Sequence, residues 1–251
     1  TDEIVYGKDN GLGLIDMRGL DYDDEKWDEL LDQLTPSDYQ TLITQSGYGT
    51  AAIKSVDKPS TTDRDAATGL VNYGVDASGN FYFKGNITHC GVIVLAQTYN
   101  DDLATHYGEN IGDESYYLDV DGWYAPAVNM HRTAFSGRNS EYYSEDPYVA
   151  SQMASSFIQG VQSQNVGTSI KHFYANNQEH RRMSSSSELD ERTAREIYLS
   201  AFETAIREAK PWTVMCSYNR INGVYAAENR RALTDVLRGE WGFDGFVVSD
   251  W

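Results

Sequence analysis

The stretch Gly242-Phe243-Asp244-Gly245-Phe246-Val247-Val248-Ser249-Asp250-Trp251 decides how the rest of the chain is interpreted. Its apolar run, which ends at Val248, is typical of a strand buried in a parallel sheet. Asp250 comes directly after that run, so its carboxylate is expected at the carboxyl end of the strand. Ligand sites of parallel α/β folds form at this end. Asp250 is therefore the first candidate for a catalytic residue, and capping of a following helix is the alternative role.

Apolar segments of the same kind recur along the chain and alternate with helical patterns. The predicted strands are residues 91–96, 123–129, 166–172, 212–218 and 243–249, with a weaker one near 56–63. Helices are predicted after Asn100, after Asp146-Pro147, over residues 194–209 and after Asn229. Ser187 with Asp190 is interpreted as a capping box at the start of the third helix. This alternation predicts right-handed βαβ units and a parallel sheet.

The predicted fold class is α/β, a TIM-like (β/α)8 barrel that is incomplete in this chain, because fewer than eight strands can be found. Residues 1–55 are expected to form a helical lead-in that packs on the barrel, with a helix that starts at Thr35-Pro36-Ser37-Asp38. Residues 56–251 are expected to be a partial catalytic barrel, truncated after the strand that carries Asp250. Residues 65–85 and 184–187 are expected to be loops.

Composition excludes several classes of partner. The net charge of −18 makes nucleic acid and anionic membranes poor partners, and no apolar run reaches the roughly 18 residues of a membrane span. Cys90 and Cys216 are expected to be buried free thiols. The sequence shows no zinc or haem spacing and no phosphate-binding loop, so no metal or cofactor is expected. A soluble protein is expected, either cytoplasmic or secreted.

Polar and charged residues gather at the predicted strand ends, and each has more than one possible role. Lys171 and His172 could donate hydrogen bonds to sugar hydroxyls, but a buried ion pair without a ligand is an alternative, and a strand-end lysine also suits Schiff-base chemistry. Trp251 could stack on a sugar ring or simply pack. The remaining candidates at this rim are Asn129, His131, Arg132, Met215, Tyr218 and Asn219, with Asp65 and Arg138 from loops.

Four segments carry a resemblance to glycoside hydrolase family 3. They are Gly137-Arg138-Asn139-Ser140-Glu141-Tyr142-Tyr143-Ser144-Glu145-Asp146-Pro147, Lys171-His172-Phe173-Tyr174-Ala175-Asn176-Asn177-Gln178-Glu179, Val214-Met215-Cys216-Ser217-Tyr218-Asn219 and the stretch 242–251 quoted above. They follow one another in the order that the family shows, over residues from about 65 to 251. The helical lead-in resembles that of members in which the barrel is the second domain.

The resemblance implies a retaining β-glycosidase that removes non-reducing terminal β-D-glucose, or a similar sugar such as xylose, from a β-glucoside or short oligosaccharide. Asp250 would be the nucleophile, and the acid/base Glu would lie outside this chain, on a companion polypeptide that also supplies the rest of the barrel. The sugar subsite would be lined by Asp65, Arg132, Lys171, His172, Met215, Tyr218 and Trp251. Asp65 has a competitor in Asp63, since the family's Asp-Gly-Pro is replaced here by Asp65-Ala66-Ala67.

Two functions of other classes stay open at the level of sequence. A Schiff-base lyase would use Lys171 and would form an adduct that borohydride traps. A non-catalytic sugar-binding module would bind glucose weakly and would not turn it over. Glucose and xylose are both compatible with the residues at the rim.

Overall fold

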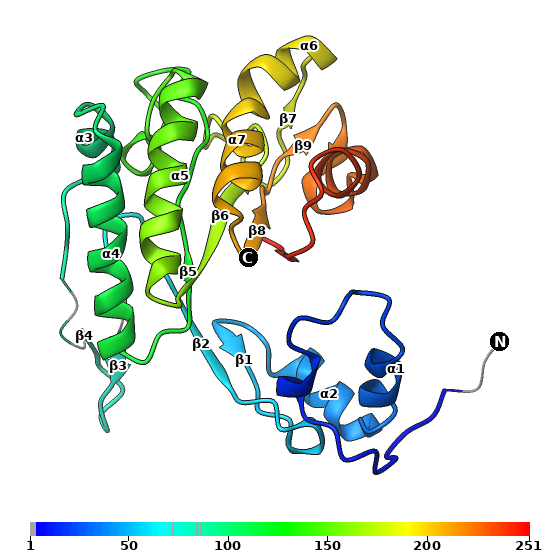
Figure 1. The fold of residues 1–251 in the computed structure, drawn as a ribbon. Coiled ribbons are helices and arrows are strands. Elements are labelled where there is room, and N and C mark those ends of the chain that lie inside the picture. The colour runs from blue at the N-terminus through cyan, green and yellow to red at the C-terminus, as the bar shows by residue number, and fades with distance from the viewer. Residues whose placement is uncertain (1–3, 72, 84, 86) are drawn as a thin grey trace. The chain divides into compact units, whose positions relative to one another are not determined.

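The computed structural model describes residues 4–71, 73–83, 85 and 87–251, and it divides into two compact units, Thr1–Asp63 and Arg64–Trp251. Figure 1 traces both units from the N-terminus to the C-terminus. The assignment of residues 1–55 to a lead-in and of residues 56–251 to a barrel stays a prediction.

The N-terminal unit is built from short helices around a small core. Its elements are η1 (Leu14–Met17), α1 (Lys26–Leu31), α2 (Pro36–Thr44), β1 (Gly49–Thr50) and η2 (Lys54–Val56). The predicted start of α2 is confirmed: the Asp38 backbone N–H donates to Thr35 Oγ1 at 3.2 Å, and the Thr35 N–H donates to Asp38 Oδ2 at 2.8 Å. The buried core consists of Met17, Leu30, Leu34, Ile53 and Val56.

The second unit contains a curled sheet that confirms an incomplete α/β barrel. The strands lie in the order β2 (Thr61–Asp65), β5 (Gly122–Tyr124), β6 (Gly167–Phe173), β8 (Thr213–Cys216) and β11 (Phe246–Val248). The β5–β6, β6–β8 and β8–β11 pairs are parallel. Parallel neighbours bring their carboxyl ends to one edge, so the residues after β6, β8 and β11 share the same rim.

The long helices of this unit are α4 (Asp101–Tyr117), α5 (Pro147–Ser163), α7 (Ser200–Ala209) and the π-helix η6 (Arg231–Glu240). Asn100 caps α4 by accepting from Leu103 N–H, and Asp146 caps α5 with Pro147 at its first position. Asn229 Oδ1 accepts from Ala232 N–H at 3.0 Å. The caps predicted at Asp146 and Asn229 are confirmed, and the helix predicted after Asn100 is capped by that residue. The shorter elements are α3 (Val92–Ala96), η3 (Asn139–Glu141), β7 (Ser186–Ser187), α6 (Glu191–Thr193), η4 (Ala194–Tyr198), β9 (Arg220–Ile221), β10 (Val224–Tyr225) and η5 (Ala226–Glu228).

Glycines let α4 and α5 pack with their backbones almost in contact. A Cβ on Gly108 would lie 2.3 Å from the Phe157 carbonyl oxygen, and one on Gly160 would lie 2.2 Å from the Thr105 carbonyl oxygen. Real Cβ atoms do not approach that closely, so any larger residue would force the helices apart. The two helices therefore form a closely packed pair beside β5 and β6.

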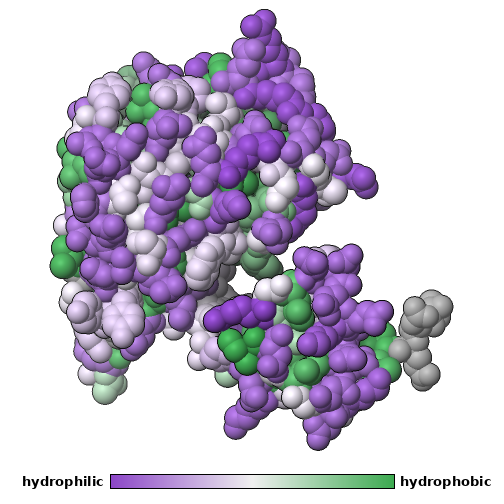
Figure 2. Space-filling model, viewed as in Figure 1, coloured by the Kyte–Doolittle hydropathy of each residue, from purple (hydrophilic) through white to green (hydrophobic). Residues whose placement is uncertain are grey.

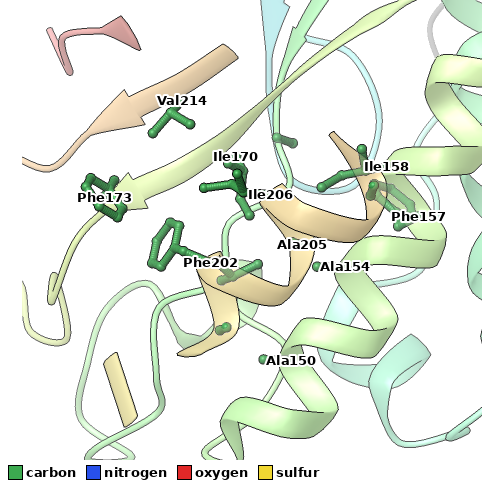
Figure 3. Packing of buried hydrophobic residues seen from close by; sticks show 14 of the residues in the cluster. Ala150, Ala154, Phe157, Ile158, Ile170, Phe173, Phe202, Ala205, Ile206 and Val214 are labelled. Carbon is green, nitrogen blue, oxygen red and sulfur yellow. The ribbon is translucent and has the colours of Figure 1, made fainter. Parts of the chain in front are cut away.

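The hydrophobic core lies between this helical layer and the sheet (Figure 3). Phe202 of α7 lies against Phe173 of β6, and Phe157 of α5 lies against Trp123 of β5, with ring centres 5.2 Å apart in each pair, and all four are buried. Burial of each such side chain is worth about 1.5–3 kcal/mol. Every residue of β6 is buried, including the polar Thr168, Ser169, Lys171 and His172, as in a strand that is covered on both faces.

The predicted strand at residues 91–96 is wrong, because this segment forms helix α3. Val92, Leu95 and Ala96 are buried whereas Val94 is 54% exposed. Spacing of buried residues at i, i+3 and i+4 is that of a helix face, and a strand in a buried sheet would have covered Val94 as well. Short apolar runs are ambiguous between the two structures, and here the partial burial decides for the helix.

The predicted loop at residues 65–85 contains a hairpin, formed by β3 (Tyr73–Val75) and β4 (Phe81–Phe83). Its turn is built on Asp76, whose Oδ1 accepts from the backbone N–H groups of Ser78 and Asn80, and on Gly79 with a φ of 84°. The expectation of a loop at 184–187 is also corrected, because Ser186 and Ser187 form the short strand β7.

Two smaller expectations also need correction. Asp190 is itself the N-cap of α6, with its Oδ1 accepting from Thr193 N–H, whereas the Ser187 hydroxyl donates to the Ala175 carbonyl, so they do not form a capping box. Cys90 is exposed, and only Cys216 is buried; both are free thiols.

The surface agrees with the acidic, polar composition. Hydrophilic residues cover most of the visible face, with apolar ones scattered among them (Figure 2). Within the part of the chain that the structure describes, no helix combines the length and the apolar character needed to cross a membrane.

Candidate active site

Asp250 follows β11 directly, and its side chain is only 8% exposed. One carboxylate oxygen, Oδ1, accepts from the Trp251 backbone N–H at 3.0 Å. The other, Oδ2, is buried without a hydrogen-bond partner among the described residues. A buried carboxylate oxygen that no donor occupies costs free energy in the resting protein, and it is available to react.

The charge state of Asp250 reflects two opposing effects. Burial raises the pKa of the carboxyl above its ordinary value. The Trp251 N–H and the positive charges of Arg138 and Lys171 act in the opposite direction and favour the carboxylate. The cations of the rim therefore help to keep this buried acid ionised.

Lys171 lies on β6 and is paired with Asp65 at the end of β2. The Nζ–Oδ1 distance is 2.5 Å, and the lysine side chain is 3% exposed while that of Asp65 is 35% exposed. The pair is therefore open to a ligand from the Asp65 side. A charged ammonium held in this way has donors with fixed directions, which suits a polyol ligand.

His172 is held by its backbone rather than by its ring alone. Asn129 Oδ1 accepts from the His172 N–H at 2.8 Å, and Asn129 Nδ2 donates to the His172 carbonyl at 2.9 Å. This fixes the orientation of the amide, so the Oδ1 that lies 3.3 Å from His172 Nδ1 is an acceptor there too. The Nδ1 atom then carries the proton, and Nε2 accepts from Arg138 Nη2 at 2.7 Å.

The imidazole of His172 is neutral. Burial is the main cause that holds its pKa well below the ordinary value, and the charges of Lys171, Arg138 and Arg182 lower it further. His172 Nε2 lies 3.9 Å from Asp250 Oδ2, but a neutral ring forms no ion pair with it. His172 therefore places an uncharged polar ring beside the Asp250 carboxylate.

The two arginines near the rim are each engaged by a glutamate. Arg138 Nε donates to Glu141 Oε1, and Arg182 Nη1 donates to Glu179 Oε2 at 3.1 Å. The Arg182 guanidinium also lies 4.7 Å from the ring centre of Tyr218. The sequence predicts Arg138 only as a possible member of the rim, contributed by a loop. Arg182 was missed, because a basic residue in a loop after β6 gives no signal of where its side chain lies.

The structure brings most of the predicted residues together. Met215 is buried on β8, where it is paired with Val248 of β11, and Tyr218 follows β8. Burial raises the pKa of Tyr218, and the neighbouring Asp250 carboxylate raises it further. Trp251 is 50% exposed, and its ring centre lies 5.8 Å from that of Tyr124. Together they offer aromatic surface beside the carboxylate.

Arg132 is the predicted residue that the structure does not bring to the cluster. It is exposed, and its guanidinium lies 5.8 Å from the ring centre of Tyr198. The position beside His172 is taken by Arg138, which contacts the imidazole directly. Among the residues that the structure describes, no three His, Cys, Asp or Glu side chains gather in a way that could hold a metal ion.

Comparisons with known proteins agree with the geometry of the rim. Residues 50–251 match the sequence model of the "Glycosyl hydrolase family 3 N terminal domain". The chain is 52% identical to thermostable beta-glucosidase B of Acetivibrio thermocellus over 157 residues, which are 62% of this chain and 21% of that protein. It is 34% identical to a beta-glucosidase of Ruminococcus albus, over 99% of this chain and 27% of that protein.

A solved structure shows the same likeness in three dimensions. Beta-glucosidase 3B from Thermotoga neapolitana, in complex with alpha-D-glucose, is 42% identical and superimposes with a TM-score of 0.81 over 90% of this chain and 34% of that one. The chain thus spans about a fifth to a third of the length of these relatives. With a match over most of its length, the chain belongs to glycoside hydrolase family 3.

Proposed function

We propose that this chain supplies the nucleophile and most of the sugar subsite of a retaining β-glycosidase. Asp250 would attack the anomeric carbon of a non-reducing terminal β-D-glucosyl or similar unit and form a covalent glycosyl-enzyme, which water then hydrolyses. The observation that carries the proposal is the buried Asp250 carboxylate, whose Oδ2 is without a hydrogen bond of normal geometry among the described residues and which lies near the Tyr218 hydroxyl and the positive charges of Arg138 and Lys171.

The surrounding residues would bind and orient the sugar. The Asp65–Lys171 pair presents both an acceptor and donors, and Trp251 offers a flat face for the ring. Hydrogen bonds to hydroxyls that strengthen in the transition state would contribute to the rate of the reaction. In this proposal Met215 and Tyr218 line the same subsite, whereas Arg138 takes the position that was expected for Arg132.

The acid/base carboxyl of a retaining enzyme would lie about 5–5.5 Å from the nucleophile and would need a proton to donate. Glu141 and Glu179, which belong to the same network of residues, each accept from an arginine. Both carboxyl groups are therefore already engaged within this chain. We therefore infer that the acid/base Glu comes from a polypeptide segment outside this chain.

The names of the relatives narrow the choice of sugar to a few pyranosides. The relatives named beta-glucosidase favour glucose, but an exo-alpha-(1->6)-L-arabinopyranosidase of Bifidobacterium longum is 50% identical over 157 residues. A pyranose ring is common to these sugars, and α-L-arabinopyranose differs from β-D-xylose in the orientation of its 4-hydroxyl. Rates of the complete protein on aryl β-D-glucoside, β-D-xyloside and α-L-arabinopyranoside would rank them, and a failure to cleave any of the three would overturn the proposal.

The Schiff-base alternative is disfavoured by the state of Lys171. A lysine that attacks a carbonyl needs an unengaged Nζ, whereas the Lys171 Nζ lies 2.5 Å from Asp65 Oδ1. A sugar-binding module without catalysis remains the competing function, and it predicts that Asp250→Ala leaves sugar turnover at the same negligible level as the unaltered protein.

A further inference from the structure

A second pocket lies at the opposite end of the strands from Asp250. It is an open pocket lined by the turn that follows α4 and the turn that follows α5, and it has a volume of about 520 Å³, within the range of small-molecule sites. We call it the basal pocket and define it by Tyr116, Tyr117, Asp119, Asp121, Gln164 and Asn165. In Figure 1, α4 and α5 end where β5 and β6 begin.

The basal pocket is separate from the candidate active site. Its lining includes Val166, which precedes β6, whereas Lys171 lies five residues further along the same strand. At about 3.3 Å per residue, the strand separates the two sites by roughly 16 Å. A ligand in one site therefore does not occupy the other.

The pocket wall is held in place by the close packing of the two helices. A Cβ on Gly112 of α4 would lie 2.6 Å from the Gln164 side chain, so a glycine is needed for that residue to reach its position. The Val120 N–H donates to the Ser115 carbonyl at 2.9 Å, and the Asn165 N–H donates to the Gln162 carbonyl at 3.0 Å. Both turns are thus fixed by their own backbone hydrogen bonds.

Two tyrosines give this pocket an unusual amount of exposed aromatic surface. Tyr116 is 74% exposed and Tyr117 is 82% exposed, and their ring centres lie 5.8 Å apart at an interplanar angle of 77°. The two rings lie together beside the pocket, so they add aromatic contact area that the fold itself does not bury. The nonpolar faces of a pyranose ring can lie against such rings.

The polar lining fits a neutral polyol. The carboxylate of Asp119 can accept hydrogen bonds from hydroxyls, and the amides of Gln164 and Asn165 can both donate and accept. No lysine or arginine is among the residues that line the pocket, so phosphates and other anions are disfavoured. Two carboxylates without a third ligand do not form a metal site, which agrees with the described residues as a whole.

We propose that the basal pocket binds a sugar unit of an oligosaccharide or polysaccharide, as a second carbohydrate site that holds the substrate chain apart from the reacting bond. The proposal rests on the proposed glycosidase function for the choice of ligand class. It does not depend on Asp250, because the two sites share no residue.

The test uses the complete protein with Asp250→Asn and Lys171→Met, so that turnover stops and the active-site subsite is weakened. Titration calorimetry with cellotetraose should still show one binding event. Addition of Tyr116→Ala and Tyr117→Ala should weaken this binding at least tenfold. Tyr148→Ala, which removes a tyrosine that is 69% exposed in the first turn of α5, is the matched control and should leave the dissociation constant unchanged.

A second variant protects the test against misfolding. Asp119→Ala keeps both rings and removes one acceptor, so it should also weaken cellotetraose binding. The absence of binding in the Asp250→Asn, Lys171→Met protein would overturn the proposal, as would an unchanged dissociation constant in both the tyrosine and the Asp119 variants. Failure of the glycosidase proposal would instead appear as no hydrolysis of aryl glycosides by the unaltered protein.

Discussion

The two ends of strand β6 present opposite kinds of polar chemistry. At the carboxyl end, Lys171 and His172 are almost fully buried, and each is fixed by a named partner. At the amino end, the basal pocket exposes two tyrosines to water. Burying a charge costs desolvation free energy, which hydrogen-bond and ion-pair partners must offset. Such a cost is expected at a site where a reaction needs polar groups that are already oriented. An open aromatic pocket has no such cost and suits binding alone.

The largest difference between the two ends should appear in turnover. Asp250→Ala in the complete protein is expected to lower kcat/KM on an aryl β-glucoside by roughly 10³- to 10⁵-fold, because the covalent route is lost. Steady-state assays measure this, and added azide should restore part of the rate by replacing the missing nucleophile. Near-normal activity of Asp250→Ala would remove the basis for treating this end as catalytic.

A smaller but specific effect is expected at Lys171. Lys171→Met keeps the length of the side chain but removes its charge, and it should lower kcat/KM by roughly 10²-fold through lost hydrogen bonds in the transition state. Because Lys171 lowers the pKa of Asp250, its removal should also move the acidic limb of the pH–rate profile to higher pH. Lys26→Met, at an exposed position, is the control. An unshifted limb would show that Lys171 does not act on Asp250.

The pH dependence should contain no limb from His172. Its pKa lies well below the ordinary histidine value, so the ring is neutral throughout the range in which a typical histidine titrates. Titration of the His172 ring by NMR should show no protonation near pH 6.5, the usual histidine value. Protonation at that value would contradict the neutral state inferred for the His172 ring.

Much of this arrangement could be predicted from the sequence, because it depends on local patterns. Asp250 and Lys171 each follow or end an apolar run, and parallel strands bring such positions to one rim. Asp146 with Pro147 predicts the start of α5, because an N-cap residue followed by proline is typical of a helix N-terminus. The position of such a residue in the fold follows from the order of the strands and helices alone.

The rest could not be predicted, for physical reasons that particular residues show. Val92 to Ala96 is too short for periodicity to separate helix from strand, and only the exposure of Val94 settles it. Arg132 and Arg138 are both basic residues near the predicted strand over 123–129, and loop geometry alone decides which of them reaches His172. The basal pocket gave no signal, because it is formed by two turns that meet only in three dimensions.

Substitutions at the two ends of β6 should also differ in their effect on the free energy of unfolding, by a smaller amount. Asn129→Ala leaves the backbone N–H and C=O of His172 without their partners, and it should lower the free energy of unfolding by about 1–3 kcal/mol. Tyr116→Ala, at the exposed end, should change it by less than about 0.5 kcal/mol. Denaturant titration of the complete protein measures both, and equal losses would erase the contrast between a preorganised end and an open one.

The smallest expected effect is a gain. Asp250→Asn should stabilise the protein by about 1 kcal/mol near neutral pH, since it removes a charge that burial disfavours. The folded-state pKa of Asp250 is raised, so its ionisation costs stability above that pKa. The gain should therefore shrink as the pH falls through the folded-state pKa. A lower midpoint of thermal unfolding for Asp250→Asn than for the unaltered protein at neutral pH would contradict the inferred cost of the buried charge.

The central claim is that Asp250 forms the covalent intermediate, and the most direct measurement is to trap that intermediate. The complete protein is incubated with an activated 2-deoxy-2-fluoro-β-D-glucoside and then digested for peptide mass spectrometry. The account predicts one fluoroglucosyl adduct per active site, on the peptide that carries Asp250, with simultaneous loss of activity. An adduct on a different carboxylate, or full turnover of substrate with inversion at the anomeric carbon and no adduct, would contradict it.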